Sequence, residues 1–362
     1  MLKRKTIRNV ALLLSLIMVF AFVAACAADP APTPPPPTPG EQPPPAAEAP
    51  APAAEAPPAA EAPPIEVVEG SAFEQSEMVV VMPAAEHGWI AAVIFFAERR
   101  GAELMAQGMG GFRLLTSTSV AEQAGQLDEL ISQRADIIVL FPHSDELDFA
   151  AQRVVDANIP LFVFNRNVNV DFNSRILGDN FEIGRATARK MGEGLGGEGI
   201  IAALAVPAIG STNYERHNSF EEAIAAFPGI EVINVPMTAV SIEEALTVTT
   251  DVLLANPQID AIFTIDDSLA LGAVQAVREL GRTDVRYING VGGSQIFFHE
   301  IADEPHINLF GATFAPTMIM DTMDLAAEYL NGRREFESVT RIPPNIVTRY
   351  NVEEFMVPGS PW

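Results

Sequence analysis

Cysteine is almost absent from this chain of 362 residues, which contains only one, Cys26. A single cysteine excludes an internal disulfide, so the folded part must depend on its hydrophobic core. Basic residues are also scarce: 22 lysines and arginines stand against 47 aspartates and glutamates, a formal charge of −25. Because a phosphate-binding surface needs a basic patch, this imbalance argues against a nucleic acid partner. It favours a neutral or cationic one.

The familiar catalytic and metal-binding motifs are missing as well. The five histidines show neither metal-ligand spacing nor an HExxH pattern, so we expect no metal site. No Gly-x-Ser-x-Gly sequence is present. The glycine-rich stretch at 194–199 (GLGGEG) follows an expected helix and leads into a strand, the reverse of a dinucleotide-binding fingerprint. We interpret it as a helix cap and a turn, and predict a protein that has no cofactor and is not an enzyme.

The first residues have the composition of a targeting segment. Basic residues at positions 3, 4, 5 and 8 precede the apolar run NVALLLSLIMVFAFVAA, which is too short and wrongly flanked for a comfortable membrane span. The run ends in Val23-Ala24-Ala25-Cys26, which resembles a bacterial lipobox. We predict that residues 1–25 are a lipoprotein signal peptide and that Cys26 carries a lipid. The alternative is an ordinary signal peptide with an incidental cysteine.

Proline, alanine and glutamate make up nearly all of residues 27–64, where the sequence AAEAP recurs. Such a stretch has nothing to bury and favours extended backbone of the polyproline II type. We therefore assign residues 26–77 to the lipidated cysteine and a disordered tether, which would hold the folded part away from a membrane.

From residue 78 onward, short apolar runs alternate with amphipathic stretches. The pattern predicts strands at 78–82, 112–116, 136–141, 160–164 and 175–180, and then, after a helix near 181–195, at 199–206, 231–235, 260–265 and 285–291. Continuous apolar strands between helices are typical of a parallel sheet covered on both faces. The sequence therefore predicts an α/β fold with two doubly wound parallel-sheet lobes.

Polar side chains follow several of these strands directly. Asn165 and Arg166 come after strand 160–164, Asp266 after strand 260–265, and Arg216 at the start of the helix after strand 199–206. In open parallel sheets, ligands bind beyond the carboxyl ends of the strands. An arginine there can bind hydroxyls or a carboxylate with fixed geometry, and Asp266 can accept hydrogen bonds from hydroxyls. Trp89, after the first strand, offers a flat face to the C–H side of a sugar ring or to any apolar ligand face.

Several longer stretches resemble the type I periplasmic binding proteins of the ribose- and galactose-binding kind. They are ANIPLFVFNRN, LGDN (177–180), YERHNSF (214–220), ANPQIDAIFTIDDSLALGAVQAV (255–277) and YINGVGG, within a resemblance that covers about residues 78–350. The resemblance implies two lobes joined by a three-strand hinge, with the ligand between them. Residues 78–179 plus 317–342 would form the N-terminal lobe, and 180–316 plus 343–362 the C-terminal lobe.

Carried over by position, the resemblance implies a set of ligand-binding residues. They would be Glu86, His87, Trp89, Asn165 and Arg166 in the N-terminal lobe, and Asn213, Arg216 and Asp266 in the C-terminal lobe. The chain departs from the family pattern where Asn165 replaces an Asp and Asp266 an Asn. Gly292 stands in place of an Asp that grips sugar hydroxyls, Pro316 in place of a Gln, and Val240 in place of a stacking aromatic residue.

The resemblance implies a function as well. We expect an extracytoplasmic solute-binding lipoprotein, anchored by Cys26 to the outer face of the cell membrane, that captures a neutral sugar or polyol. It would deliver this carbohydrate to an ABC permease and its ATPase, and act as a monomer. One alternative is a sensory protein that presents a sugar-like signal, such as a furanosyl autoinducer, or a nucleoside to a receptor. An NAD-dependent enzyme is less favoured, because VVVMPAAEHG is not a dinucleotide fingerprint.

Overall fold

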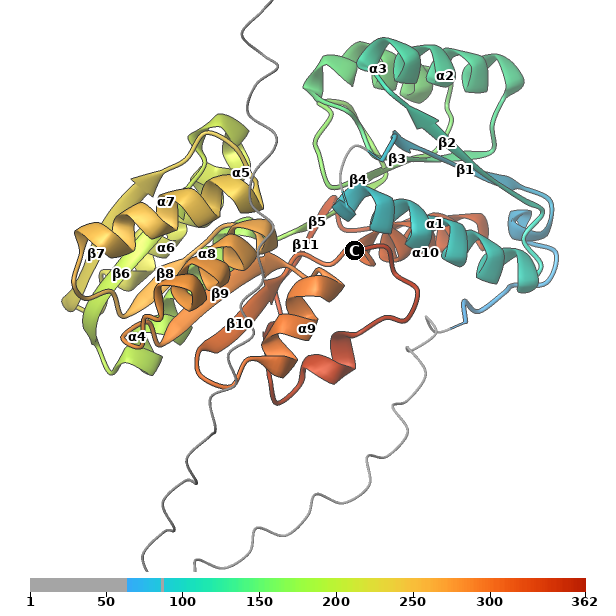
Figure 1. The fold of residues 1–362 in the computed structure, drawn as a ribbon. Helices are drawn as coiled ribbons and strands as arrows, with labels where there is room; N and C mark the ends of the chain where they lie inside the picture. Colours follow the sequence, from blue (N-terminus) through green and yellow to red (C-terminus); the bar gives the residue numbers. More distant parts are fainter. Residues whose placement is uncertain (1–63, 86–87) are drawn as a thin grey trace, which may run out of the picture. The chain divides into compact units, whose positions relative to one another are not determined.

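Two six-stranded sheets form the core of the protein in the computed structural model, which describes residues 64–85 and 88–362 (Figure 1). Sheet A has the strand order β11-β5-β4-β3-β1-β2, and sheet B has the order β12-β10-β9-β8-β6-β7. Each sheet alternates with helices along the chain. The predicted α/β fold with two parallel-sheet lobes is therefore confirmed.

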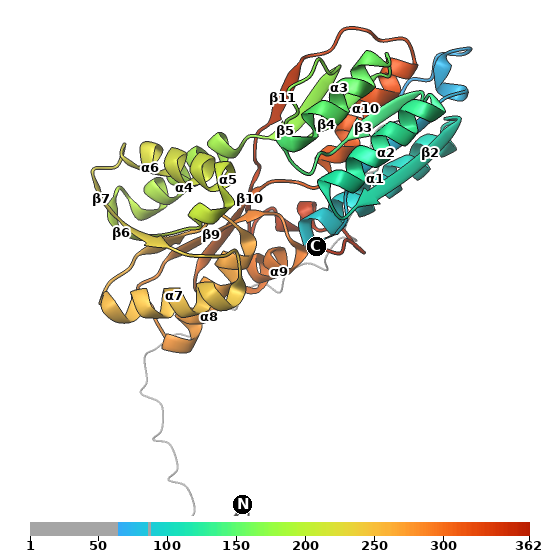
Figure 2. The same ribbon diagram turned by 90° about the horizontal axis from the view of Figure 1, so that it is seen from above.

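Sheet A is parallel throughout and is covered by helices on both faces. Its strands are β1 (Glu77–Pro83), β2 (Gly111–Ser117), β3 (Ile137–Leu140), β4 (Leu161–Phe164), β5 (Ser174–Gly178) and β11 (Val339–Ile342). Helices α1 (Gly88–Ala106) and α10 (Met318–Leu330) lie on one face, and α2 (Val120–Gln133) and α3 (Asp148–Asp156) on the other (Figures 1 and 2). Alternate residues of β1 serve the two faces: Val80 packs toward α1, and Val79 and Val81 toward α2.

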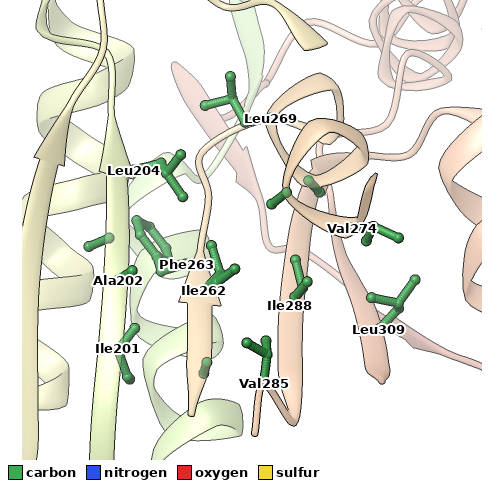
Figure 3. Packing of buried hydrophobic residues seen from close by; sticks show 14 of the residues in the cluster. Ile201, Ala202, Leu204, Ile262, Phe263, Leu269, Val274, Val285, Ile288 and Leu309 are labelled. Atoms are coloured by element: carbon green, nitrogen blue, oxygen red, sulfur yellow. The ribbon is translucent and has the colours of Figure 1, made fainter. Parts of the chain in front are cut away.

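Sheet B is built in the same way, except that its edge strand β12 is antiparallel to β10. Its strands are β6 (Glu198–Ala205), β7 (Gly229–Pro236), β8 (Ala261–Phe263), β9 (Tyr287–Gly292), β10 (Asn308–Thr313) and β12 (Ile346–Thr348). Its helices are α4 (Asn180–Leu195), α6 (Ser219–Ile224), α7 (Ile242–Ala255), α8 (Asp267–Leu280) and α9 (Gln295–Asp303). Figure 3 shows its core, where Ile262 and Ile288 from neighbouring strands lie near Val274 of α8.

The chain passes between the two sheets at three places. The first lies between β5 and α4, the second at residues 314–317 between β10 and α10, and the third at residues 343–345 between β11 and β12. Helix α4 packs in the core of sheet B, and α10 in the core of sheet A. Each sheet therefore takes its last strand, β11 in sheet A and β12 in sheet B, from the C-terminal part of the chain. The residue boundaries of the two lobes stay a prediction.

The glycine-rich stretch at 194–199 is a helix end, as we interpreted it. Gly196, with φ 74°, caps α4, and its N–H donates to the carbonyl oxygens of Gly192 and Glu193. Strand β6 begins two residues later. A left-handed residue after the last helical turn is the usual place for glycine, so the motif needs no phosphate ligand to explain it.

Residues 64–76, which we assigned to the tether, lie against sheet A. Phe73, in the short helix η1 (Ala72–Glu74), is fully buried between α1 and α10 residues, and Ile65 and Val67 pack on the same cluster. The N–H of Ile65 donates to Gln107 Oε1 at 3.0 Å, and that of Val68 to Asn331 Oδ1 at 3.1 Å. The folded part thus begins before residue 78, because these few apolar residues reach the core despite the polar composition around them.

This packing sets where the chain can be shortened. We expect a chain beginning at Pro64 to keep its full stability, and a chain beginning at Ala72 to lose about 2 kcal/mol of unfolding free energy. The loss combines the apolar contacts of Ile65 and Val67 with three hydrogen bonds to Gln107 and Asn331, each contributing about 1 kcal/mol or less. Urea denaturation of the two chains checks this, and equal midpoints would contradict it.

None of the helices in the described parts of the chain is both long and apolar enough to cross a bilayer.

Candidate functional site

An aromatic cluster lies where sheet A meets the connection from β10 to α10. It consists of Trp89, Phe141, Phe164 and Phe314, and none of these side chains is more than 9% exposed. The Trp89 ring centroid lies 6.1 Å from those of Phe141 and Phe164 and 5.3 Å from that of Phe314. Trp89 Nε1 donates a hydrogen bond to the Phe314 carbonyl oxygen at 2.8 Å. Packing and a satisfied indole N–H together make this cluster a fixed surface.

We expected Trp89 to offer an open ring face to a ligand, but the structure buries its ring in the aromatic cluster. Its ring is stacked on Phe164 with an interplanar angle of 9°, and Phe141 meets it edge-on. The sequence could not show this, because the phenylalanines come from the ends of β3 and β4, far from Trp89 along the chain. Trp89 supports the site from within the aromatic cluster.

Two arginines lie over opposite ends of the aromatic cluster. The guanidinium carbon of Arg166 lies 5.5 Å from the centre of the Phe141 ring, and that of Arg216 lies 4.8 Å from the centre of the Phe314 ring. Arg166 is exposed and donates a hydrogen bond to the carbonyl oxygen of His143. The structure thus brings Trp89, Arg166 and Arg216 together through shared aromatic neighbours, each within cation–π reach.

Arg216 is buried, only 6% exposed, whereas we expected it at a loop and helix start. It sits in a π-helical turn, Tyr214–Asn218, between the short α5 (Ser211–Asn213) and α6. Its Nε donates to Asn180 Oδ1 and one terminal nitrogen donates to the Ile265 carbonyl oxygen, both at 2.8 Å. Burial lowers the pKa of Arg216 to about 10, against the opposing effect of nearby carboxylates, so the group stays charged at neutral pH.

Two neighbouring aspartates stand at the start of α8. Asp266 is the N-cap, and its Oδ1 accepts a hydrogen bond from Ser268 N at 2.8 Å. Asp267, 1% exposed, accepts through Oδ2 from the N–H groups of Gly293 and Ser294, both at 2.7 Å. Its Oδ1 has no hydrogen-bond partner among the described residues. Burial, and then the charge of Asp266, raises the pKa of Asp267 to about 7.

The raised pKa of Asp267 predicts a pH-dependent stability. The folded protein binds this proton more tightly than the unfolded chain, so the contribution is fully present below about pH 4 and is lost as pH rises through about 7. We expect the unfolding free energy of the wild type, relative to Asp267→Asn, to fall by about 1 kcal/mol per pH unit in this window. Asparagine keeps the acceptor for both N–H groups but does not titrate. Parallel pH profiles for the two proteins, from urea denaturation, would contradict the assignment.

The remaining predicted site residues have mixed placements. Asn213 is buried, and its Oδ1 accepts from Val206 N at 2.7 Å, which holds the end of β6. Asn165 has φ 61° and donates its backbone N–H to the Ile176 carbonyl oxygen, which turns the chain directly after β4. Glu86, His87 and Cys26 lie outside the described residues.

Sequence reasoning missed three side chains that build the site: Phe314, Asn180 and Asp267. Asn180 stood in the LGDN stretch and Asp267 beside Asp266, so both were within motifs that we quoted. Phe314 had no such signal, because its importance comes from its place in a connection between the sheets. No group of histidine, cysteine and acidic residues suited to a metal ion occurs within residues 64–85 and 88–362.

A cavity of about 250 Å³ lies beside the second connection between the sheets. Its lining includes Gly292 and Pro316, the positions where the resemblance places two sugar-binding side chains, and Trp362. Neither Arg166, Arg216 nor Asp266 lines it. The cavity and the two arginines therefore lie in neighbouring parts of one region, around the connection at residues 314–317 that contains Phe314.

Comparison with known proteins gives a family for this arrangement. Residues 78–334 match the family described as periplasmic binding protein domain. A xylitol-binding protein of Mycolicibacterium smegmatis is 30% identical over 180 residues, 49% of this chain and 51% of that protein. The match thus spans about half the length of that relative. A D-apiose import binding protein of Actinobacillus succinogenes is 27% identical over 67% of this chain and 80% of its own length.

Solved structures share the fold. A periplasmic solute-binding protein of an ABC transporter from Actinobacillus succinogenes 130z, with bound D-allose, superposes with a TM-score of 0.65 at 21% identity. The match covers 77% of this chain and 99% of that one. A periplasmic ribose ABC transporter protein from Conexibacter woesei gives a TM-score of 0.69 at 18% identity, over 78% and 95% of the two chains. At these identities the likeness concerns the fold.

Proposed function

Because the chain belongs to the periplasmic binding protein family, we propose that it binds a neutral sugar or polyol next to the aromatic cluster and delivers it to an ABC importer. The family consists of solute receptors and not of enzymes, which sets aside the NAD-dependent enzyme considered from the sequence. The observation that carries the proposal is the pair of guanidiniums over opposite ends of one aromatic cluster. The buried rings hold the guanidiniums in place, and fixed hydrogen-bond donors are what a polyhydroxylated ligand needs.

The charges around Arg216 support a neutral ligand. The carboxylates of Asp266, Asp267 and Glu215 all act on the guanidinium of Arg216. A negatively charged ligand would have to compete with these groups for the same cation, whereas hydroxyls can donate to the carboxylates and accept from the arginines. The relatives named for xylitol, D-apiose and ribose suggest small ligands of this class.

A matched pair of ligands tests the proposal. The full chain would be titrated by calorimetry with xylitol, D-apiose and D-ribose, and with D-xylonate, which replaces one terminal alcohol of xylitol by a carboxylate. We expect binding near micromolar affinity, about −8 kcal/mol, for at least one neutral ligand, and weaker binding of xylonate than of xylitol. Small-angle scattering should then show the protein contracting, because a ligand that touches both lobes favours their closed arrangement. Tighter binding of xylonate, or no binding of any neutral ligand, would refute the proposal.

We propose further that Cys26 carries a lipid that holds the protein on the outer face of the cell membrane. The support is the small-residue sequence before the only cysteine of the chain. Two acyl chains give stable anchoring where one is marginal. Cys26→Ala should therefore move the protein from the membrane fraction to the soluble fraction, or block its processing. Wild-type protein found mature in the soluble fraction would count against the anchor.

A further inference from the structure

Trp362 lies between two glycines, one in helix α1, which covers sheet A, and one in strand β9 of sheet B. A Cβ atom added to Gly88, the first residue of α1, would stand 2.1 Å from Trp362 Cδ1. A Cβ atom added to Gly292, the last residue of β9, would stand 2.4 Å from Trp362 Cη2. The two edges of the indole therefore occupy the space where side chains at these positions would lie. Only glycine admits the ring at both places.

The segment that leads to Trp362 is held against the rest of the protein by packing contacts and a hydrogen bond. Residues 352–362 begin with the short helix η5 (Val352–Phe355), whose Phe355 packs against Phe298 of α9 with ring centroids 6.2 Å apart. Val357 N donates to Gln295 Oε1 at 2.8 Å. Phe355 packs on the core of sheet B, whereas Val357 and Trp362 pack on the core of sheet A. We had assigned residues 343–362 to the C-terminal lobe alone, but this last part contacts both.

The position of Trp362 coincides with a gap in the set of expected ligand contacts. Gly292 stands where the resemblance places a sugar-gripping Asp, and Val240 where it places a stacking aromatic residue. Trp89 cannot supply the missing face, because it is only 9% exposed within the aromatic cluster. Trp362 is half-buried and lines the cavity of about 250 Å³ together with Gly292 and Pro316. It is thus an aromatic surface that fills the volume left open by Gly292 and borders the available space.

We propose that Trp362 is a specificity-determining residue of the ligand site: its indole forms a wall of the cavity and packs on the C–H face of a small sugar or polyol. This proposal rests on the proposed function. A cavity of this size lies just below the range of about 300–1,000 Å³ for small-molecule sites, which favours pentoses and pentitols over larger ligands. The C–H groups of such a ligand give an aromatic ring an apolar surface to cover while its hydroxyls reach polar side chains.

The test compares variants of the full chain by calorimetry with xylitol and D-ribose. Trp362→Ala should weaken binding of the probe that the wild type binds by at least tenfold, and Trp362→Phe by no more than about threefold, because phenylalanine keeps an aromatic face. Tyr350→Ala, which removes a 91% exposed aromatic side chain from the same end of the chain, is the control and should bind like the wild type. Trp362→Ala binding as well as or better than the wild type would overturn the proposal.

A second variant tests the position of the Trp362 ring without removing the ring. Gly88→Ala puts a methyl group where the indole lies, so it should displace the ring and weaken binding as Trp362→Ala does. Adding Gly88→Ala to Trp362→Ala should then cost nothing more, because there is no ring left to displace. Additive losses in the double variant would overturn the placement of Trp362. If the wild type binds neither probe nor D-apiose, the proposed function fails, and the inference fails with it; a failure of Trp362 alone leaves wild-type binding intact.

Discussion

Replacing Arg216 with alanine is expected to weaken ligand binding about a hundredfold and to lower the unfolding free energy by about 3 kcal/mol. The affinity is lost because a buried charged donor disappears from the Phe314 end of the aromatic cluster. The stability is lost because Asn180 Oδ1 and the Ile265 carbonyl oxygen then have no donor from Arg216, and an unsatisfied buried acceptor costs about 1–3 kcal/mol. The sequence pattern placed Arg216 at the start of a helix, whereas the structure buries it, and this burial is why a loss of stability is expected.

Arg166→Ala is the matched control for this variant. Both arginines lie over rings of the same aromatic cluster, but Arg166 is exposed, so its removal should cost affinity with little change in the urea midpoint. Calorimetry and urea denaturation of the two variants separate binding from folding. If Arg216→Ala keeps wild-type stability, the hydrogen bonds to Asn180 and Ile265 do not contribute to the unfolding free energy. If both variants bind normally, the site lies elsewhere.

Arg100→Met is expected to cost about 3–5 kcal/mol of stability at pH 7, the largest effect on folding alone. Arg100 is fully buried on α1, and its Nε and one terminal nitrogen donate to Asp324 of α10 at 2.6 Å and to Glu103 at 2.8 Å. Burial already raises the pKa of Asp324, and Arg100 opposes that shift. Without the guanidinium, the largely buried Asp324 carboxylate is left beside Glu103 and Glu328 without the cation it pairs with, so the cost comes mainly from an uncompensated charge.

Measurements at lower pH and a second substitution test whether the stability loss of Arg100→Met comes from an uncompensated charge. The loss in Arg100→Met should shrink between pH 7 and pH 5, because Asp324 and Asp321, whose pKa values burial already raises and Arg100 lowers, bind protons in the folded variant that the unfolded chain does not hold. Arg100→Met combined with Asp324→Leu should recover most of the stability at pH 7, since both charges are then replaced by apolar groups. A double variant as unstable as Arg100→Met would mean that packing of the arginine stem, and not the ion pair, is what α1 and α10 require.

The sheets could be predicted because their strands carry a strong local signal. β1 and β4 are buried on both faces, so their sequences are continuous apolar runs that differ from the flanking helices. The start of the folded part could not be predicted in the same way. Ile65 and Val67 are two apolar residues next to a proline- and alanine-rich stretch, and only their contacts with the core of sheet A reveal their role.

The candidate site was predictable in kind but not in detail. The rule that ligands bind at the carboxyl ends of parallel strands pointed to Arg166 and Asp266. It could not show that Arg216 is buried, because that depends on a π-helical turn and on Phe314 from a distant connection. Nor could it show Trp362, whose contacts with Gly88 and Gly292 arise only when segments far apart in the sequence meet.

The late strands β11 and β12 have a consequence for the order in which the protein can fold during synthesis and export. Arg175 of β5 pairs with Val339 of β11, and Phe310 of β10 pairs with Thr348 of β12. Neither sheet therefore has all of its strands until the last part of the chain has been made. In a nascent chain that stops before β11, β5 and β10 are exposed at a sheet edge, although they are interior strands of the complete sheets, and they can there pair wrongly with another chain. Because the connection at 343–345 is short, β5 and β10 gain their outer neighbours β11 and β12 within the same few residues of synthesis. A chain of this design gains by being kept unfolded until nearly all of it has emerged.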